Sequence, residues 1–393
     1  MKIIVQKFGG TSVATQQRRE MVADKIIDAI DRGYKPVVVV SAIGRKGDPY
    51  ATDTLLSLIN NGNCSISKRE VDLLLCCGEI ISAVVMAETL EKRGYKVTVL
   101  TGGQAGIITN NDFGNAEVLK VETKKIMDLL YSGVIPIVTG FQGMTQEGDF
   151  TTLGRGGSDV TGAILGEALK AEFIEIYTDV DGIMTADPRI VPEAKVINRI
   201  SYNEVFQFAD QGAKVIHPKA VEYAMRGNIP LYIKNTLSNA PGTIITSSRE
   251  SRNKIITGIT HMSNRSQVSV HFNEDDSNEI FDILADNMIS IDLINVFPKY
   301  KVFTVDTKDI YKVEEILKEL KLEYNIINNC SKIAVIGNGM KGVPGVMAKI
   351  LKTLNENGIK VLQTADSHST IWCLVKDEDT IKAINLLHKA FEL

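Results

Sequence analysis

Up to about residue 248, short apolar runs alternate with stretches of helical periodicity. Val37–Val40 is four valines in succession, as expected for a strand buried on both faces of a parallel sheet. Further strands are predicted at Val97–Leu100, Val134–Val138, Phe173–Tyr177 and Ile229–Ile233. Helices are predicted at Arg18–Asp31, Glu70–Lys92, Ala116–Tyr131 and Ser158–Leu169, and a hairpin at Gly140–Leu153. This alternation indicates an α/β fold with an open, mostly parallel sheet sandwiched by helices.

The pattern changes after Thr246, where the polar stretch 247–254 predicts a domain boundary. Beyond it, Leu284-x4-Ile289-x-Ile291 recurs 70 residues later as Leu354-x4-Ile359-x-Val361. Strand-like 301–306 corresponds to 371–376, and helix-like 309–320 to 379–390. Each copy reads strand, helix, strand, strand, helix and a closing strand, which predicts two small α+β modules of ferredoxin-like order. The predicted domains are 1–248, 249–330 and 331–393, with residues 255–262 as an alternative source of the last module's first strand.

Composition narrows the class of protein. The 393 residues are more than one core usually holds, and 44% apolar with 23% charged residues is typical of a globular protein. A net charge of −4 without a basic run argues against nucleic acid as a partner. By the hydrophobic pattern, we expect no apolar stretch of the roughly 20 residues that span a bilayer. Because the strand pattern starts at residue 2, we also expect no leader segment, and a cytoplasmic location. Five scattered cysteines, two of them adjacent, suit neither a metal site nor a simple disulfide and are expected to be buried free thiols.

The first candidate site is the turn after the opening strand, Lys7-Phe8-Gly9-Gly10-Thr11-Ser12. Two glycines let a backbone turn sharply and present N–H groups to an anion. Lys7 would add a positive charge, and Thr11 and Ser12 would cap a helix that starts near Val13. The alternative is an ordinary turn between a strand and a helix.

A second glycine turn, Gly154-Arg155-Gly156-Gly157-Ser158-Asp159, also precedes a predicted helix. Arg155 carries the planar fork that grips a carboxylate, and the glycines again offer N–H groups. A structural turn with a surface arginine is the alternative here.

Acidic and basic residues follow later strands. Asp179 and Asp181 come directly after a strand, where ligands bind in open α/β sheets, and Asp187-Pro188-Arg189 follows them. Carboxylates beside a nucleotide act through Mg²⁺ or ribose hydroxyls, although Asp-Gly and Asp-Pro also mark plain turns. Lys214 stands in a loop of small residues and would neutralise a phosphate, whereas His217, before a proline, is expected to pack or to cap a helix.

Two further features need an interpretation. Glu79 lies within the apolar helix 73–85, where burial of a carboxylate is costly unless the group is paired or functional. Glu79 would therefore hold a substrate ammonium, or else it would occupy an exposed position of the helix. Gly337-x-Gly339-x-x-Gly342 after a strand resembles a dinucleotide turn, which would make the chain a dehydrogenase. Only 51 residues follow it, too few for two nucleotide-binding halves, so we disfavour this interpretation.

Five motifs occur in order: residues 7–12, 154–159, 178–182, 185–189 and 212–218. Together they resemble the aspartate kinase branch of the amino-acid kinase family, and the tail is similar to the paired ACT modules that sense end-product amino acids in that branch. The resemblance implies the reaction ATP + L-aspartate → ADP + 4-phospho-L-aspartate, with Mg²⁺, as the first step towards lysine, threonine and methionine. The acceptor carboxylate is already ionised, so the reaction needs no general base and catalysis becomes positioning and charge neutralisation.

The resemblance also implies roles for individual residues. Lys7 would bridge the transferring phosphoryl group, and Asp159 would order Lys7. Arg155 would grip the substrate α-carboxylate, Glu79 its ammonium and Thr52 its reacting carboxylate. The remaining implied substrate contacts are Gly156, Gly157 and Ser158. The implied nucleotide contacts are Lys7, Phe8, Gly9, Gly10, Thr178, Asp179, Asp187, Arg189 and Lys214.

In the tail, Ser290, Ile291 and Asp292 lie where this branch places effector contacts. Residues 271–276 lack the Pro-Gly turn common there, whereas the second module has Val343-Pro344-Gly345, so the effector (lysine, threonine or diaminopimelate) and its module stay open. Pairing of ACT modules between chains implies a homo-oligomer, at least a dimer. The alternatives are a related kinase for glutamate, N-acetylglutamate, carbamate or UMP, and a non-catalytic amino-acid sensor.

Overall fold

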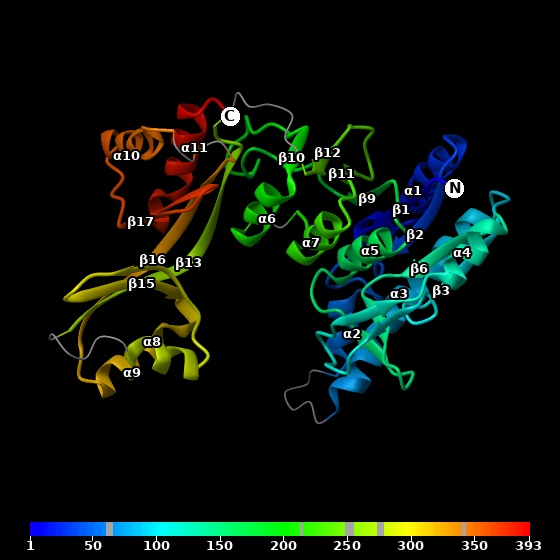
Figure 1. Cartoon of the computed structure of the whole chain (residues 1–393), viewed down its shortest axis with the longest axis horizontal. Coiled ribbons are helices and arrows are strands. Elements are labelled where there is room, and N and C mark those ends of the chain that lie inside the picture. The colour runs from blue at the N-terminus through cyan, green and yellow to red at the C-terminus, as the bar shows by residue number, and fades with distance from the viewer. Residues whose placement is uncertain (60–65, 213–214, 248–254, 273–278, 339, 341–342) are drawn as a thin grey trace. The chain divides into compact units, whose positions relative to one another are not determined.

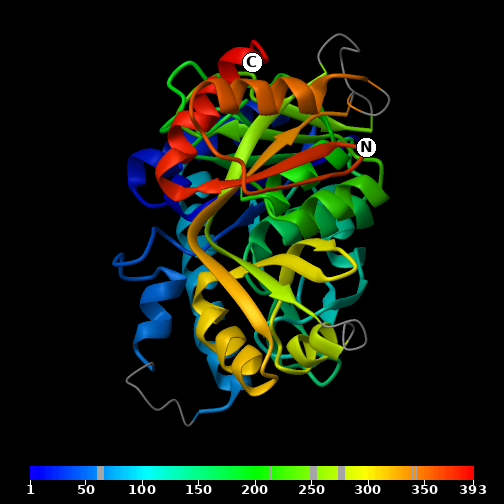
Figure 2. The same ribbon diagram turned by 90° about the vertical axis from the view of Figure 1, so that its left-hand side faces the viewer.

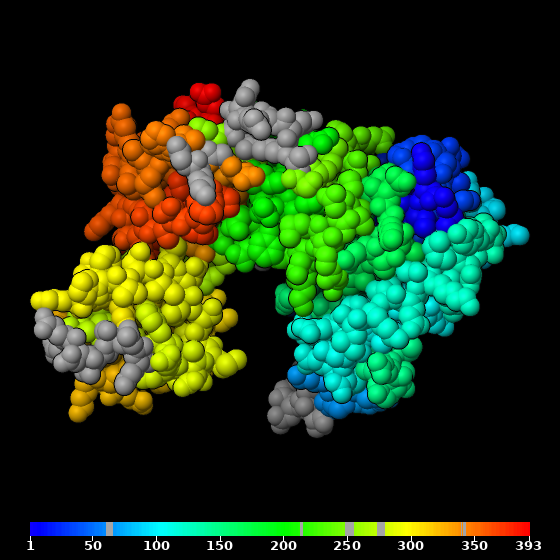
Figure 3. Space-filling view, in the orientation of Figure 1, coloured from blue at the N-terminus to red at the C-terminus, as the bar shows by residue number. Residues whose placement is uncertain are grey.

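The computed structural model describes the chain except residues 60–65, 213–214, 248–254, 273–278, 339 and 341–342. The chain forms two compact units (Figure 1). Unit 1 comprises residues 1–183, 196–209 and 214–250; unit 2 comprises 184–195, 210–213 and 251–393. The predicted first domain, 1–248, therefore includes two short segments that belong to unit 2, namely 184–195 and 210–213. The surface of each unit is drawn in Figure 3.

Unit 1 is built on an eight-stranded sheet in the order β10-β12-β11-β9-β1-β2-β6-β3. Its strands are β1 (Ile3–Phe8), β2 (Lys35–Val40), β3 (Val97–Leu100), β6 (Ile135–Thr139), β9 (Phe173–Thr178), β10 (Arg199–Ser201), β11 (Leu231–Asn235) and β12 (Thr243–Thr246). The pairs β1–β2, β1–β9, β2–β6, β3–β6 and β9–β11 are parallel, and β11–β12 is antiparallel. The carboxyl ends of the central strands therefore meet at one edge of the sheet, where ligands bind in open α/β folds.

Helices cover both faces of this sheet. The helices of unit 1 are α1 (Gln16–Asp31), α2 (Thr52–Ser57), α3 (Lys68–Glu91), α4 (Lys124–Tyr131), α5 (Gly157–Ala168), α6 (Tyr202–Asp210, whose last residue belongs to unit 2) and α7 (Pro218–Arg226). Apolar residues of α1 and α3 pack with Phe8, Val38 and Val40 in one core. Gly162 of α5 lies against the side chain of Lys7, so neighbouring residues of β1 face different helices.

A second, four-stranded sheet lies in unit 1 in the order β5-β4-β7-β8. Its strands are β4 (Ile107–Thr109), β5 (Val118–Val121), β7 (Gln142–Met144) and β8 (Phe150–Thr152). β7 and β8 form the predicted hairpin. The helix predicted over Ala116–Tyr131 was wrong in its first half, because residues 118–121 pair with β4 and only 124–131 are helical.

Unit 2 contains an antiparallel six-stranded sheet in the order β14-β15-β13-β16-β18-β17. Its strands are β13 (Gly258–His271), β14 (Ile291–Val296), β15 (Tyr300–Asp306), β16 (Glu323–Ile336), β17 (Gln363–Asp366) and β18 (Thr370–Lys376), and its helices are α8 (Glu279–Asp286), α9 (Ile310–Glu319), α10 (Val346–Glu356) and α11 (Thr380–Ala390). β13 and β16 are long and paired along their length, with a register shift near Met262–Arg265. Figure 2 shows both strands running through the two halves of the unit. One half packs around α8 and α9, and the other around α10 and α11.

Two expectations from composition need correction. Among the described residues one helix, α3, is long and apolar enough to cross a membrane by length and composition, a test that the core helix of a folded protein also passes; more than half of its most apolar window is buried inside the chain. Cys76, Cys330 and Cys373 are buried and free as predicted, whereas Cys77 is free but exposed. Cys76 lies on the buried side of α3, next to the buried Leu75, whereas Cys77 lies on the exposed side of this helix.

Candidate active site

The glycine turn after β1 is bound on both sides by its neighbours in the sheet. Gly9 N donates to Tyr177 O of β9 at 3.1 Å, and Gly44 N, from the loop after β2, donates to Gly10 O at 3.0 Å. A Cβ on Gly10 would lie 2.4 Å from Ala42 O and 2.6 Å from Gly44 O. Only glycine therefore fits at position 10 without moving backbone.

The turn continues as a short 3₁₀ helix, Gly10–Ser12. Within the described residues, the N–H groups of Gly10 and Thr11 donate no hydrogen bond, so they are free for an anion. The predicted helix start near Val13 was wrong, because α1 starts at Gln16 and its cap is Thr15, whose side chain accepts from Arg18 N. Ser12 is used otherwise: its Oγ lies 2.6 Å from Thr236 Oγ1.

Lys7 links this turn to the second one. The residue is 8% exposed, and its Nζ lies 2.6 Å from Asp159 Oδ1, in the first turn of α5. A Cβ built on Gly9 would lie 3.7 Å from the same nitrogen. The ammonium of Lys7 thus lies next to both glycine turns.

The second glycine turn places the start of α5. Gly154 and Gly156 have φ values of 76° and 70°, a region that glycine adopts without strain. Gly157 begins α5, Ser158 is buried, and Arg155 is exposed. His217 lies against Gly156 and caps α7 by accepting from Lys219 N at 3.3 Å, so the predicted capping role is confirmed.

Glu79 is buried, with 2% of its surface exposed. Its Oε1 accepts from Ala42 N at 3.2 Å, directly after β2. Its Oε2 has no hydrogen-bond partner among the described residues. Burial raises the pKa of this carboxyl to about 8, although the hydrogen bonds from Ala42 and Gln142 oppose the shift. The alternative of an exposed helix position is therefore excluded, and the free oxygen suits a buried cation.

Thr52 begins α2, which packs beside α3. A Cβ on Gly78, next to Glu79, would lie 2.9 Å from Ala42 Cβ and 3.0 Å from Tyr50 O. The loop between β2 and α2 is thus in contact with α3. This contact explains how Thr52 and Glu79, distant in sequence, belong to one part of the fold.

Residues after β9 and β11 form the other side of the edge. Asp179 makes an ion pair with Arg45. Asp181 Oδ1 accepts from Asn235 Nδ2 and from Ser238 Oγ, both at 2.8 Å. Arg45, Asn235 and Ser238 were not predicted from the sequence. Only Arg45 carried a signal, because it stands between Gly44 and Gly47 in the loop that follows a buried parallel strand.

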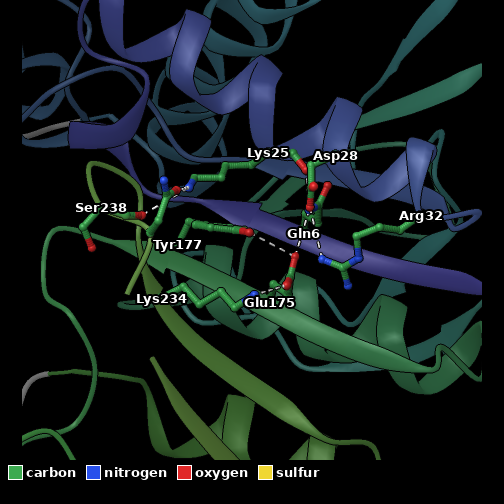
Figure 4. A network of polar contacts seen from close by, with 9 residues as sticks. Gln6, Lys25, Asp28, Arg32, Glu175, Tyr177, Lys234 and Ser238 are labelled. Atoms are coloured by element: carbon green, nitrogen blue, oxygen red, sulfur yellow. Dashed lines mark hydrogen bonds and ion pairs between the residues drawn. The ribbon is translucent and has the colours of Figure 1, made fainter. Parts of the chain in front are cut away.

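A buried polar network lies on the α1 face of the same strands (Figure 4). Glu175 of β9 is 3% exposed and contacts Lys234 Nζ of β11 at 2.6 Å and Gln6 Nε2 of β1 at 2.8 Å. Tyr177 donates to Glu175 at 3.2 Å, and its ring stacks on Phe8 with 4.8 Å between centroids. The network therefore fixes three neighbouring strands shortly before their carboxyl ends.

Other predicted residues lie in unit 2 or outside the described residues. The Asp187 carboxylate accepts from Arg189 N at 2.9 Å and from its guanidinium at 2.6 Å, and these bonds to Arg189 lower the pKa of Asp187. Asp292, at the start of β14, pairs with Lys332, and Ser290 is exposed. Lys214 lies outside the described residues, as do Gly339, Lys341 and Gly342 of the dinucleotide-like turn.

No group of three or more His, Cys, Asp or Glu that could hold a metal ion occurs within the described residues. Two cavities of about 250 and 400 Å³ lie in unit 1, one against α7 and the other beside the start of α3. Neither is lined by Lys7, Glu79 or Arg155. The candidate site therefore does not coincide with either of these two cavities.

Comparisons with known proteins agree with this arrangement. The family model of the Amino acid kinase family matches residues 2–235, and that of the ACT domain matches 325–389. Aspartokinase 1 of Bacillus subtilis is 46% identical over 402 residues, covering 100% of both chains. The structure of E. coli aspartokinase III in complex with aspartate and ADP (R-state) superposes with a TM-score of 0.81 at 27% identity over 100% of both chains. The same enzyme in complex with lysine and aspartate (T-state) gives 0.77 at 27%, again over 100% of both.

Proposed function

The chain belongs to the aspartokinase branch of the amino acid kinase family, and we propose that it transfers the γ-phosphoryl group of Mg²⁺-ATP to the side-chain carboxylate of L-aspartate. The products are ADP and 4-phospho-L-aspartate. The fold is accordingly the α/β amino-acid kinase fold followed by ACT modules, and the enzyme is a phosphotransferase with a carboxyl acceptor.

One observation carries the proposal: the Lys7 ammonium lies beside Gly9 of the first glycine turn and 2.6 Å from Asp159 of the second. Bringing a carboxylate to a triphosphate requires that the repulsion of two anions be overcome. A cation held between two N–H-rich turns lowers that barrier where charge builds up. Asp159 would keep the ammonium in place.

On the substrate side, the proposal assigns the aspartate ammonium to Glu79 and its α-carboxylate to Arg155. The free Oε2 of Glu79 and the exposed fork of Arg155 support these roles. Thr52 would orient the reacting carboxylate, and Gly156, Gly157 and Ser158 would line the pocket. Effective positioning of two bound reactants supplies much of the rate enhancement in such reactions.

On the nucleotide side, the proposal assigns the phosphates to Lys7, Phe8, Gly9 and Gly10, and the remaining contacts to Thr178, Asp179, Asp187, Arg189 and Lys214. Mg²⁺ binds through one or two carboxylates together with nucleotide phosphates. Asp179 and Asp181, both directly after β9, are carboxylates of the kind that suits this ion. When bound, the ion would neutralise charge on the phosphates.

The proposal includes feedback regulation of this first step towards lysine, threonine and methionine. The lysine complex of the E. coli relative and the ACT match support an amino-acid effector, with Ser290, Ile291 and Asp292 as contacts. Lysine, threonine and diaminopimelate are the candidates. A homo-oligomer paired through ACT modules and a cytoplasmic location belong to the same proposal.

The test is phosphorylation of a panel of acceptors, measured by ADP release and hydroxamate trapping. We expect turnover with aspartate and little with glutamate, N-acetylglutamate, carbamate or UMP. Adding lysine, threonine and diaminopimelate singly identifies the effector by loss of rate. Preference for another acceptor would refute the substrate assignment, and amino-acid binding without any turnover would instead support a non-catalytic sensor.

A further inference from the structure

Arg45 lies on the loop after β2, directly beside the phosphate turn. Its neighbour Gly44 donates N–H to Gly10 O at 3.0 Å. Arg45 N donates to Asp48 Oδ2 at 2.7 Å, and Asp48 N donates back to Arg45 O at 2.8 Å. Gly44 and Gly47 have φ values of 84° and 100°, which closes this small loop tightly. The backbone of Arg45 is therefore fixed one residue from the contact with Gly10.

The side chain of Arg45 reaches across the sheet edge to Asp179. In the sheet order β9-β1-β2, Arg45 follows β2 and Asp179 follows β9, with β1 between them. Adjacent strands are about 4.8 Å apart, so the two outer strand ends are separated by roughly 10 Å. The segment between them is Gly9–Gly10, bonded to Tyr177 on one side and to Gly44 on the other. The guanidinium thus spans the end of β1 at the glycine turn.

The ion pair that holds Arg45 is open to water. The side chains of Arg45 and Asp179 are 67% and 45% exposed. Exposed ion pairs contribute little to stability, so the guanidinium can change partners at small cost. A nucleotide phosphate carries more charge than one carboxylate and accepts the two parallel hydrogen bonds that the arginine fork donates.

We propose that Arg45 is a further phosphate-binding residue: Asp179 holds its guanidinium over Gly9–Gly10 until a nucleoside triphosphate arrives, and the guanidinium then binds the γ-phosphate. This inference rests on the proposed function. Lys7 and Arg45 approach the turn from different elements, one paired with Asp159 and the other with Asp179. Asp179 then acts on the nucleotide by positioning Arg45.

The test compares Arg45→Met and Arg45→Lys with Lys46→Met, an exposed cation of the same loop. Binding of a non-hydrolysable ATP analogue and of ADP, each with Mg²⁺, is measured by calorimetry. We expect Arg45→Met to weaken the triphosphate analogue roughly 10- to 100-fold, as for a lost charge-assisted hydrogen bond, and ADP much less. Arg45→Lys should recover part of the loss, and Lys46→Met should stay within about twofold.

Equal affinities of Arg45→Met and Lys46→Met for the ATP analogue would overturn the proposal. It would also be overturned if Arg45→Met weakened the binding of ADP as much as the binding of the analogue. Arg45 is exposed, so all three variants should fold, which thermal unfolding checks. The binding assay needs no aspartate. A wild-type chain that makes no aspartyl phosphate but binds the analogue through Arg45 would therefore refute the proposed function alone.

Discussion

If Glu79 binds the substrate ammonium, as proposed, aspartate binding depends on pH in a direction that the burial of this carboxyl sets. Burial raises its pKa to about 8, so at pH 7 only about 10% of the free protein carries the carboxylate. If the carboxylate holds the substrate ammonium, the protonated majority must lose its proton before binding. The apparent affinity at pH 7 is then about tenfold weaker than at a pH well above 8.

The assay is the KM for aspartate at saturating Mg²⁺-ATP between pH 6 and 9. We expect log KM to fall with a slope near −1 up to about pH 8 and then to level off, because free aspartate itself does not titrate between pH 6 and 8. Glu79→Gln should remove the slope and raise KM at pH 8.5 roughly 10- to 100-fold, since a neutral amide replaces a buried charge partner. Glu88→Gln, at an exposed position of the same helix, is the matched control. A wild-type KM independent of pH, or the same slope in Glu79→Gln, would refute the reasoning.

The same carboxyl links stability to pH. The unfolded chain loses this proton near the ordinary value of 4.5, whereas the folded chain keeps it up to about pH 8. Between these values the folded state binds the extra proton, so its stability falls as pH rises, by about 1.4 kcal/mol per pH unit. Glu79→Gln lacks this titrating carboxyl, so its free energy of unfolding should not fall with pH in this way. The difference in free energy of unfolding between the wild type and Glu79→Gln should therefore grow with pH.

Three further predictions concern the turns and the network. Lys7→Met should lower kcat about 100- to 1,000-fold with an unchanged circular dichroism spectrum, and near-normal kcat would contradict the role of the ammonium. Gly10→Ala should lower Tm by several degrees, because its methyl would lie 2.4 Å from the carbonyl oxygen of Ala42. Gly9→Ala should change Tm little, since the nearest atom to its methyl would be 3.6 Å away. Equal shifts of Tm in the two variants would contradict this steric argument. Glu175→Gln should destabilise unit 1 by about 3 kcal/mol in urea unfolding, because the ammonium of Lys234 loses its buried partner, and an unchanged midpoint would show that the pair contributes nothing.

The sequence predicted those parts of the fold whose signal is local. Buried strands such as Val37–Val40 and the repeat in the tail followed from hydrophobic pattern alone, whereas the burial of Glu79 stayed open until the packing of its helix was known. The helix over Ala116–Tyr131 was wrong because pairing of 118–121 with β4 is a tertiary contact that outweighs local preference. The start of α1 was misplaced for a related reason: Ser12 bonds to Thr236, which is distant in sequence.

The partners of the site residues could not be predicted, because each joins elements far apart in the chain. Lys7 and Asp159 are separated by 152 positions, and Arg45 and Asp179 by 134. Both members of the first pair were predicted as site residues from their motifs. Arg45 was not, since no motif contains it and only the strand order shows that its side chain reaches over the glycine turn.

The pairing of charges at the sheet edge would allow the proposed site for two anions to stay folded when it is empty. Lys7 is held by Asp159 and Arg45 by Asp179, so each of these two cations has an internal carboxylate. The first pair is mostly buried, with side chains 10% and 15% exposed, and should persist when the nucleotide binds; the second is exposed and can exchange. Asp159→Asn should therefore lower kcat through Lys7, whereas Asp179→Asn should mainly change the KM for ATP. Equal effects of the two variants on kcat would show that both pairs have the same role.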